Sequence, residues 1–429
     1  MKKFFERFTN SAWINNVSFV LAGKAASMVM LQLFDILVAR RLSVDGYSEW
    51  AYFFSILSLL FFVGWFGVGS SARISASTAA SAEEKKEYVK ASLVLQLAVT
   101  AVVALLLFLF AQPLAARLGY PERYPSLLTL LRIGSGILFL SAYMDLFKNL
   151  YQGLEEYRLL ALMTFTEYAG YLVFAAVFLC LSSDITAVAL AYAAGGALTV
   201  GADLFCLHRK MPLRNTSFQK QKMKALMKYA LPMLAISVGA VLLAELDVIM
   251  LGILGSKTDV SFYSIAKRLC DKATHLNESI AAGTVTSLAI LNRDNLEERI
   301  AQFRKLDRMN LAASAAAVAV LAGIAIVFIP VFYGAAYQGA TLVMLTLLPY
   351  YVLIGISNLY GRMVDMYGGA WGRSAWFLSA IVLDLVLNCL LIPRWGAYGA
   401  ALATNLSLIP YTVYTVAALG RIYKTIRSG

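Results

Sequence analysis

The 429-residue chain has few charged side chains and few of the residues that build metal sites and disulfides. Charged residues make up 14% of the sequence, against about 25% in a typical soluble domain. The sequence holds only 2 histidines and 4 cysteines, and the cysteines are scattered: Cys180, Cys206, Cys270 and Cys389. Without a Cys or His cluster, we expect neither a zinc or iron site nor a disulfide framework.

Motifs for nucleotide chemistry and hydrolysis are also missing. The chain contains no G-x-x-x-x-G-K-[ST] segment, which argues against ATP-driven transport by this chain alone. It contains no Ser–His–Asp or metal-ligand arrangement that would support catalysis. We therefore expect a protein that is not an enzyme and that needs no cofactor.

Long apolar runs dominate what is present. Hydrophobic residues make up 60% of the chain and the mean hydropathy is +0.70, and a membrane span needs about 20 mostly apolar residues. The pattern predicts an all-α polytopic membrane protein with twelve transmembrane helices near 13–38, 47–70, 89–111, 126–147, 159–181, 185–207, 228–254, 261–290, 309–332, 341–360, 374–392 and 397–419. The loops between them are short, so we expect no catalytic domain outside the membrane.

The Lys and Arg residues predict the orientation of these spans. With both termini inside, most cations fall in the inner loops, as cytoplasmic loops require. The net charge of +12 therefore reflects topology and does not indicate nucleic acid as a partner. The polar start of the chain is not a secretory signal, so we expect the first span to be retained in a plasma-membrane protein.

The second half of the chain repeats the first. Leu33–Val38 is answered by Glu245–Met250, so that Asp35 and Asp247 each lie late in a long apolar helix. We predict a first six-helix bundle at 1–207 and a second at 228–429, around a central cavity. Two such bundles are the usual architecture of a carrier, with the binding site between them.

A basic linker at 208–227 joins the two predicted bundles. Between His208 and Lys228 the chain carries seven Lys and Arg residues, Pro212 and no acid. We expect this linker on the cytoplasmic face, where anionic headgroups of membrane lipid would hold it.

Charges inside the spans are the candidate functional residues, because a charge in hydrocarbon costs at least about 2.5 kcal/mol and normally faces a cavity or a partner. In the first span, Lys24 and Asp35 share a helix face. Both could line the cavity, or each could pair with a neighbouring helix. Arg132 could add a positive site in the first half, although structural pairing is an equal alternative for it and for Asp145, Glu167, Asp203 and Asp384.

The eighth span is the most unusual helix. Arg268 and Lys272 lie on one face with His275, and the second, mixed-sign stripe contains Lys267, Asp271 and Glu278. We interpret the first face as a cationic wall on a water-filled cavity that binds an anionic ligand. The alternative is a solvated extension of the helix beyond the membrane.

Two acids of the seventh span, Glu245 and Asp247, point about 160° apart on a helix, so only one can face the cavity squarely. The repeat favours Asp247, because Asp35 is its counterpart. Either acid could be a proton or cation site, and a buried salt bridge to the eighth span is an equal alternative.

Three segments together resemble a known family. Val38–Ser48 resembles the A-R-x-L-…-x-x-Y/F-G segment of polysaccharide-unit flippases, which serve O-antigen, capsule and exopolysaccharide synthesis. Leu246–Gly252 with Phe262–Leu269 is similar to the family's second-half segment, and Trp395–Thr404 to its G-x-x-G-A-A-x-A-T stretch. These flippases belong to the multidrug/oligosaccharidyl-lipid/polysaccharide exporter superfamily.

The resemblance implies a carrier with a MATE-like fold in a bacterial inner membrane, which turns a polyprenyl-diphosphate-linked oligosaccharide to the outer leaflet with coupling to H⁺ or Na⁺. On this hypothesis Lys24, Arg268 and Lys272 bind the substrate, Asp247 or Glu245 couples, and a polymerase or ligase of the pathway is a partner. The alternative within the superfamily is a drug/cation antiporter, which would use the acids of the cavity. A glycosyltransferase would need a large loop with paired acids, which the chain lacks.

Overall fold

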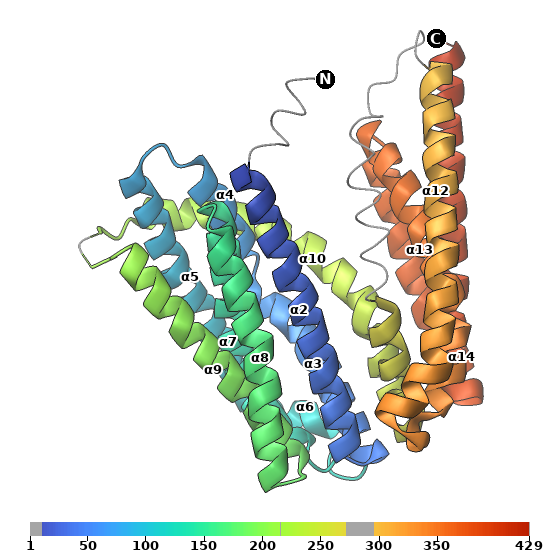
Figure 1. Cartoon of the computed structure of the whole chain (residues 1–429), viewed down its shortest axis with the longest axis horizontal. Coiled ribbons are helices and arrows are strands. Elements are labelled where there is room, and N and C mark those ends of the chain that lie inside the picture. Colours follow the sequence, from blue (N-terminus) through green and yellow to red (C-terminus); the bar gives the residue numbers. More distant parts are fainter. Residues whose placement is uncertain (1–10, 215, 272–295, 429) are drawn as a thin grey trace. The chain divides into compact units, whose positions relative to one another are not determined.

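The computed structural model describes residues 11–214, 216–271 and 296–428, which are helical almost throughout and contain no strand (Figure 1). Eight helices in these ranges are long and apolar enough to cross a membrane: Val44–Trp65, Ala82–Leu109, Leu127–Gly153, Tyr157–Leu181, Ile185–Lys210, Leu296–Tyr333, Gly339–Met366 and Ala370–Ser428. The chain is therefore a multi-pass membrane protein. The count of twelve spans stays a prediction.

The chain divides into two compact units, Met1–Glu245 and Leu246–Gly429. The division falls inside helix α10 (Lys220–Leu254) and not in the basic segment before it. The reason is that this segment and the start of α10 are bound to the first unit: the Lys90 ammonium donates to the Thr216 carbonyl (2.6 Å) and the Ser71 hydroxyl to the Leu226 carbonyl (2.8 Å). Lys222 also forms an ion pair with Glu84, so a carboxylate of the protein neutralises part of the basic segment.

The first unit is a helical bundle around α7. Helix α7 packs against α3, α4, α5 and α9, while α8 packs against both α2 and α9 (Figure 1). The helices before α10 are α2 (Ser11–Arg41), α3 (Val44–Trp65), α4 (Val68–Thr78), α5 (Ala82–Leu109), α6 (Ala111–Arg117), α7 (Leu127–Gly153), α8 (Tyr157–Leu181) and α9 (Ile185–Lys210).

Local signals explain where these helices begin and break. The Ser81 hydroxyl accepts from the Glu84 amide at 3.1 Å, and the Glu84 carboxylate accepts from the Ala80 amide at 2.9 Å, so both side chains cap the start of α5. The predicted span at 47–70 is divided into α3 and α4, because Phe66 (φ 49°) and Gly67 (φ 71°) adopt left-handed conformations between them.

Small residues allow α8 and α9 to approach closely. A β-carbon at Gly195 would lie 2.8 Å from the backbone nitrogen of Tyr171 and 2.9 Å from the carbonyl carbon of Gly170. The run of small residues at 193–197 therefore has the packing role that membrane helix interfaces favour.

The second unit contains the end of α10, the helical residues 257–271 and the elements that follow residue 295. These elements are α12 (Leu296–Gly323), the π-helical η2 (Ile324–Tyr333), the short η3 (Ala335–Tyr337), α13 (Gly339–Met366) and α14 (Ala370–Ser428). Gly396 (φ 52°, ψ −129°) kinks α14, so this helix contains both of the spans predicted at 374–392 and 397–419.

A proline in η2 removes a backbone donor, and a side chain replaces it. Pro330 has no amide hydrogen for the carbonyl of Ala325, which lies five residues earlier in the π-helical segment. The Thr341 hydroxyl of α13 donates to this carbonyl at 2.9 Å. Such replacement is how membrane helices tolerate an internal proline.

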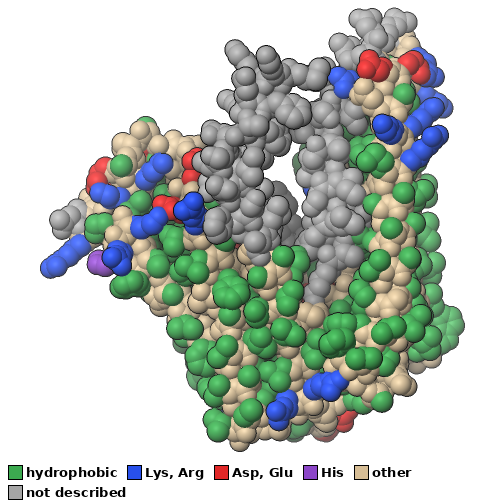
Figure 2. Space-filling model, viewed as in Figure 1, with side chains coloured by type: hydrophobic (Ala, Val, Ile, Leu, Met, Phe, Trp, Pro, Cys, Tyr) green, Lys and Arg blue, Asp and Glu red, His purple; other side chains and the backbone are tan. Residues whose placement is uncertain are grey.

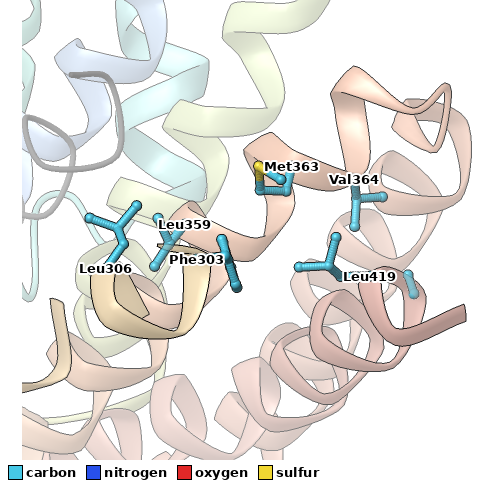
Figure 3. Packing of buried hydrophobic residues seen from close by; sticks show 7 residues of the cluster. Phe303, Leu306, Leu359, Met363, Val364 and Leu419 are labelled. Carbon is cyan, nitrogen blue, oxygen red and sulfur yellow. The ribbon is translucent and has the colours of Figure 1, made fainter. Parts of the chain in front are cut away.

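The second unit has a hydrophobic core at one end of α12 (Figure 3). Phe303 and Leu306 of α12 pack against Leu359, Met363 and Val364 of α13 and against Ala418 and Leu419 of α14. Elsewhere hydrophobic side chains cover much of the exposed surface, as expected for helices that face lipid (Figure 2).

Candidate functional site

In each unit, a buried aspartate of a long helix accepts a hydrogen bond from a tyrosine on the next helix. The Tyr47 hydroxyl of α3 donates to Asp35 Oδ1 of α2 at 3.0 Å. The Tyr263 hydroxyl donates to Asp247 Oδ2 of α10 at 2.5 Å. Asp35 and Asp247 are 4% and 0% exposed. The correspondence between these aspartates in the sequence therefore extends to their hydrogen-bond partners.

In the second unit this pair is part of a larger buried network. The Lys267 ammonium lies 3.3 Å from Asp247 Oδ2. The Asn388 amide donates both to Asp247 Oδ1 at 2.8 Å and to Asp384 Oδ2 at 3.1 Å, so one side chain bridges the carboxylates. Asp384, Asn388 and Asp247 are each at most 1% exposed. The network thus connects α10, the helical residues 257–271 and α14.

Two hydroxyl groups of α14 also donate hydrogen bonds to the carboxylates. The Thr404 hydroxyl donates to Asp247 Oδ2 at 3.2 Å, and the Ser407 hydroxyl donates to Asp384 Oδ1 at 3.2 Å. Thr404 follows the kink at Gly396, while Asp384 precedes it. The kinked helix therefore contributes both a carboxylate and the donors that stabilise it.

The charges of the network do not balance among these side chains. Asp247 and Asp384 are two carboxylates, and Lys267 is the only cation bonded to them in the hydrogen bonds and ion pairs described above. An uncompensated charge in a low-dielectric interior is costly. Asn388 Oδ1 is buried and accepts no hydrogen bond, so a further acceptor lies beside the carboxylates. The carboxylate oxygens and the Asn388 oxygen could together bind a proton or a monovalent cation.

The corresponding region of the first unit is aromatic. The ring of Phe34, next to Asp35, lies 6.2 Å from Trp50, 6.4 Å from Tyr171 and 6.1 Å from Tyr192. Tyr171 and Tyr192 are stacked at 3.9 Å. The two units therefore share the Asp–Tyr pair but differ in the side chains around it.

The first unit contains a cavity of about 380 Å³ between α3, α7, α8, α9 and the Val241–Glu245 part of α10. Its lining is aromatic on α3 and polar on α7 and α8. The polar residues include Asp145, Lys148 and Glu167.

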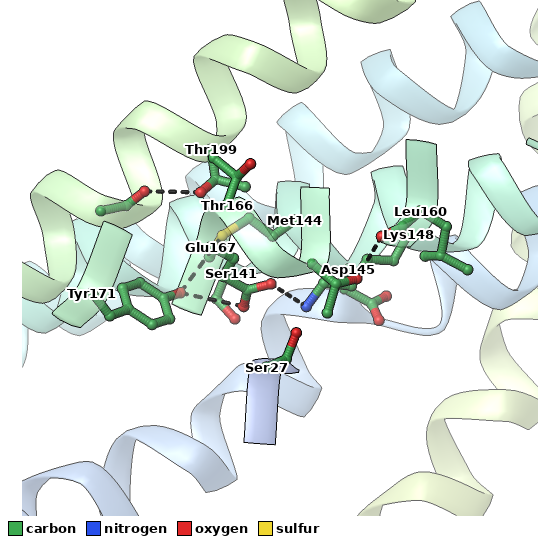
Figure 4. Close-up of polar contacts among 12 residues, drawn as sticks. Ser27, Ser141, Met144, Asp145, Lys148, Leu160, Thr166, Glu167, Tyr171 and Thr199 are labelled. Carbon is green, nitrogen blue, oxygen red and sulfur yellow. Dashed lines mark hydrogen bonds and ion pairs between the residues drawn. The ribbon is translucent and has the colours of Figure 1, made fainter. Parts of the chain in front are cut away.

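An ion pair between helices α7 and α8 joins two residues of the cavity lining (Figure 4). The Lys148 ammonium is 2.5 Å from Glu167 Oε2, and the Tyr171 hydroxyl donates to Glu167 Oε1 at 3.4 Å. The Asn149 amide donates to Asp145 Oδ1 at 3.2 Å. The pairing that we considered for Glu167 from the sequence is therefore present.

Four of the charged residues proposed from the sequence can be placed within their own units: Lys267, Asp247, Glu245 and Arg132. Lys267 pairs with Asp247, so the alternative of a buried salt bridge to the eighth span is observed. Glu245 is half-buried and lines the cavity of the first unit, whereas Asp247, which the repeat favoured as the acid that faces a cavity, is fully buried in the network. Arg132 is exposed, 5.9 Å from the Phe108 ring centre.

The other proposed residues are only partly described. Arg268 and Asp271 are half-buried on the helical residues 257–271. Lys272 and Glu278 lie outside the described residues, as does the side chain of Lys24, whose backbone belongs to α2.

The sequence did not point to Asn388, and for Asp384 it left structural pairing as an equal alternative to a ligand role. These residues are four apart on α14, and the i, i+4 spacing places them on one helix face. A pair of polar residues on one face of an apolar helix was the feature of the sequence that could have indicated a buried polar site. Its connection to Asp247 spans 141 residues of sequence and could not be read from local spacing.

The fold is shared with solved membrane transporters. An inward-facing multidrug resistance MATE family transporter of the MOP superfamily matches with a TM-score of 0.73 and 14% identity, over 95% of this chain and 99% of that one. The lipid II flippase MurJ, in an inward closed conformation, matches with a TM-score of 0.76 and 15% identity, over 95% and 89%. The eukaryotic MATE transporter AtDTX14 matches with a TM-score of 0.63 and 13% identity, over 97% and 98%.

These likenesses define the class, a multi-pass membrane protein with the MATE-like fold. The sequence profile described as polysaccharide biosynthesis protein matches residues 13–286, which is more than half of the chain. The protein therefore belongs to the polysaccharide biosynthesis protein family. No curated protein sequence matches it significantly.

Proposed function

We propose that this protein is a flippase that moves a polyprenyl-diphosphate-linked oligosaccharide repeat unit across a bacterial inner membrane by alternating access. The observation that carries this proposal is the family match over residues 13–286, in a chain whose fold is shared with a lipid II flippase over 95% of its length. A lipid-linked glycan agrees with the family match, because it is a substrate of polysaccharide synthesis, and with the shared flippase fold, because it is a lipid.

The network around Asp247 and Asp384 is our candidate for the coupling site, with H⁺ or Na⁺ as the coupling ion. It is buried, holds an excess carboxylate over the ammonium of Lys267, and offers the Asn388 oxygen as an additional acceptor. A cation that enters would compete with the donors that now bind the carboxylates. Because those donors lie on separate helices, its arrival would change how strongly the helices are held together.

A strain without the protein tests the function. We expect polyprenyl-linked repeat units to accumulate on the cytoplasmic side and surface polysaccharide to disappear, with both effects reversed by the intact gene. The mass of the accumulated lipid would identify the repeat unit. Normal surface polysaccharide in this strain would contradict the flippase proposal.

Variants test the coupling site. Asp247→Asn and Asp384→Asn should each abolish the dependence of glycan transport on a proton or sodium gradient in proteoliposomes. Asp45→Asn is the matched control, because Asp45 is an exposed carboxylate at the start of α3. Gradient dependence that survives in both network variants would place coupling elsewhere.

The proposed function also involves an orientation in the membrane and partner proteins. We propose that both termini are cytoplasmic, because this arrangement places most Lys and Arg residues in cytoplasmic loops. The product in the outer leaflet would be the substrate of a polysaccharide polymerase or ligase. Reporter fusions at each terminus test the orientation, since an outer location of either end would contradict it.

A drug/cation antiporter is the second candidate. The fold shared with a multidrug transporter over 95% of this chain and the buried carboxylates are compatible with it, but the family match does not favour it. It predicts that a strain without the protein becomes sensitive to cationic dyes such as ethidium, with surface polysaccharide unchanged.

A further inference from the structure

The cavity of the first unit has an aromatic wall on α3. Phe61 and Trp65 are stacked with centroids 6.0 Å apart and an interplanar angle of 12°, and Phe62 lies 4.6 Å from Trp65. Phe54 continues this wall about two turns earlier, with its ring 6.1 Å from that of Phe61. Trp65 and Phe62 are only partly buried, so ring surface remains for a ligand.

Helix α7 contributes polar residues to the same lining and holds Trp65 in place. Trp65 Nε1 of α3 donates to the Ser141 hydroxyl of α7 at 3.2 Å, which fixes the indole ring. Asp145 and Lys148 follow Ser141 at i+4 and i+7 on the same face of α7. Carboxylate and hydroxyl oxygens therefore line the same cavity as the aromatic rings.

The electrostatics of the cavity disfavour an anion. The Lys148 ammonium is already paired with Glu167 at 2.5 Å and lies 5.8 Å from the Tyr168 ring centre. Asp145 adds a carboxylate to the same lining. Among the described side chains of this cavity no cation is left in excess, so a phosphate or an acidic sugar would face carboxylates.

We propose that this cavity binds an uncharged sugar ring of the transported glycan, with the apolar face of the ring stacked on Trp65 and Phe62 and its hydroxyl groups donating to Asp145 and Glu167. Aromatic surface opposite a few fixed polar groups is typical of small-molecule sites. The volume of about 380 Å³ is small, so the cavity holds part of the glycan and not the whole lipid-linked substrate. This inference rests on the proposed flippase function, since it assigns the sugar end of that substrate.

The test measures binding by the full-length protein in lipid nanodiscs, with calorimetry and two soluble probes. One probe is geranyl-diphospho-N-acetylglucosamine and the other is geranyl diphosphate, which lacks the sugar. The wild-type protein should bind the first about tenfold more tightly, which corresponds to about 1.4 kcal/mol. Trp65→Leu should remove this difference and leave the affinity for geranyl diphosphate unchanged.

Matched variants separate binding from folding. Trp376→Leu is the control, because Trp376 is a partly exposed tryptophan of α14 in the other unit, and it should retain the tenfold difference. Phe62→Leu removes a neighbouring ring that is only half-buried, so it provides the same test if Trp65→Leu does not fold.

A third probe tests the sign of the charge argument. Geranyl-diphospho-glucuronic acid should bind the wild-type protein more weakly than the N-acetylglucosamine probe, and Asp145→Asn should reduce that discrimination. Equal affinity for the probes with and without N-acetylglucosamine, or tighter binding of the glucuronic acid probe, would overturn the inference. If one of these two results were found while the protein still supported glycan export in cells, the proposed sugar site would be wrong and the flippase proposal would stand.

Discussion

Replacing Lys267 with methionine should destabilise the second unit strongly. Lys267 is 9% exposed, and its ammonium lies 3.3 Å from Asp247 Oδ2 in the buried network. Methionine preserves most of the side-chain volume but removes the charge. Asp247 and Asp384 would then share the Asn388 amide, and their contacts with the described residues would include no cation.

The magnitude follows from the remaining hydrogen bonds. Removing one partner of a buried ion pair typically costs about 3–5 kcal/mol, because the other charge is left uncompensated. Asp247 would keep the donors from Tyr263, Asn388 and Thr404, and protonation of one carboxyl limits the penalty. We therefore expect the lower end, about 3 kcal/mol in the free energy of unfolding.

A double-mutant cycle is the assay. The free energy of unfolding is measured by SDS titration in mixed micelles for Lys267→Met, Asp247→Asn and the double variant. Asp247→Asn should recover part of the loss caused by Lys267→Met, with a coupling energy of about 2 kcal/mol. Lys305→Met is the control, because Lys305 is exposed on α12 and should change stability little. Additivity within about 0.5 kcal/mol would refute the ion pair as a stabilising contact.

Three further predictions concern packing and pH. Thr341→Ala should cost about 1 kcal/mol in unfolding free energy, because the Ala325 carbonyl loses its donor, while Thr341→Ser should retain most of the stability. Gly195→Val should reduce the yield of folded protein, measured by size-exclusion chromatography, because a β-carbon there meets the Tyr171 backbone at 2.8 Å. Burial raises the pKa of Tyr124, in the loop before α7, from 10.0 to about 12. The folded state therefore holds this proton more tightly, so stability falls as the pH rises from 10 to 12, and Tyr124→Phe should reduce this slope in thermal melts.

The existence of the helices could be predicted from the apolar runs, whereas some of their ends and breaks could not. The predicted spans at 126–147 and 159–181 correspond to α7 (Leu127–Gly153) and α8 (Tyr157–Leu181). By contrast, α12 (Leu296–Gly323) includes the thirteen residues before the predicted start at 309. Phe303 and Leu306 explain this extension, because tertiary packing against α13 and α14 stabilises a segment too polar to count as a span.

The candidate sites could be predicted only in part. The repeat identified Asp35 and Asp247, and both are buried and bonded to tyrosines. Periodicity shows which residues share a face of one helix but not which helices meet. For that reason the sequence could not show that Asp384 and Asp247 share one amide, or that Lys148 pairs with Glu167.

The two units share one motif and differ in chemistry, which suggests a division of function. In the second unit, the Asp–Tyr pair is surrounded by Asp384, Asn388 and Lys267, all of which respond to the charge of a small cation. In the first unit, aromatic rings surround the same pair, and the nearby cavity combines aromatic and polar surface. We infer that the second unit responds to the ion and the first binds the sugar, so that each can be altered by mutation without the other.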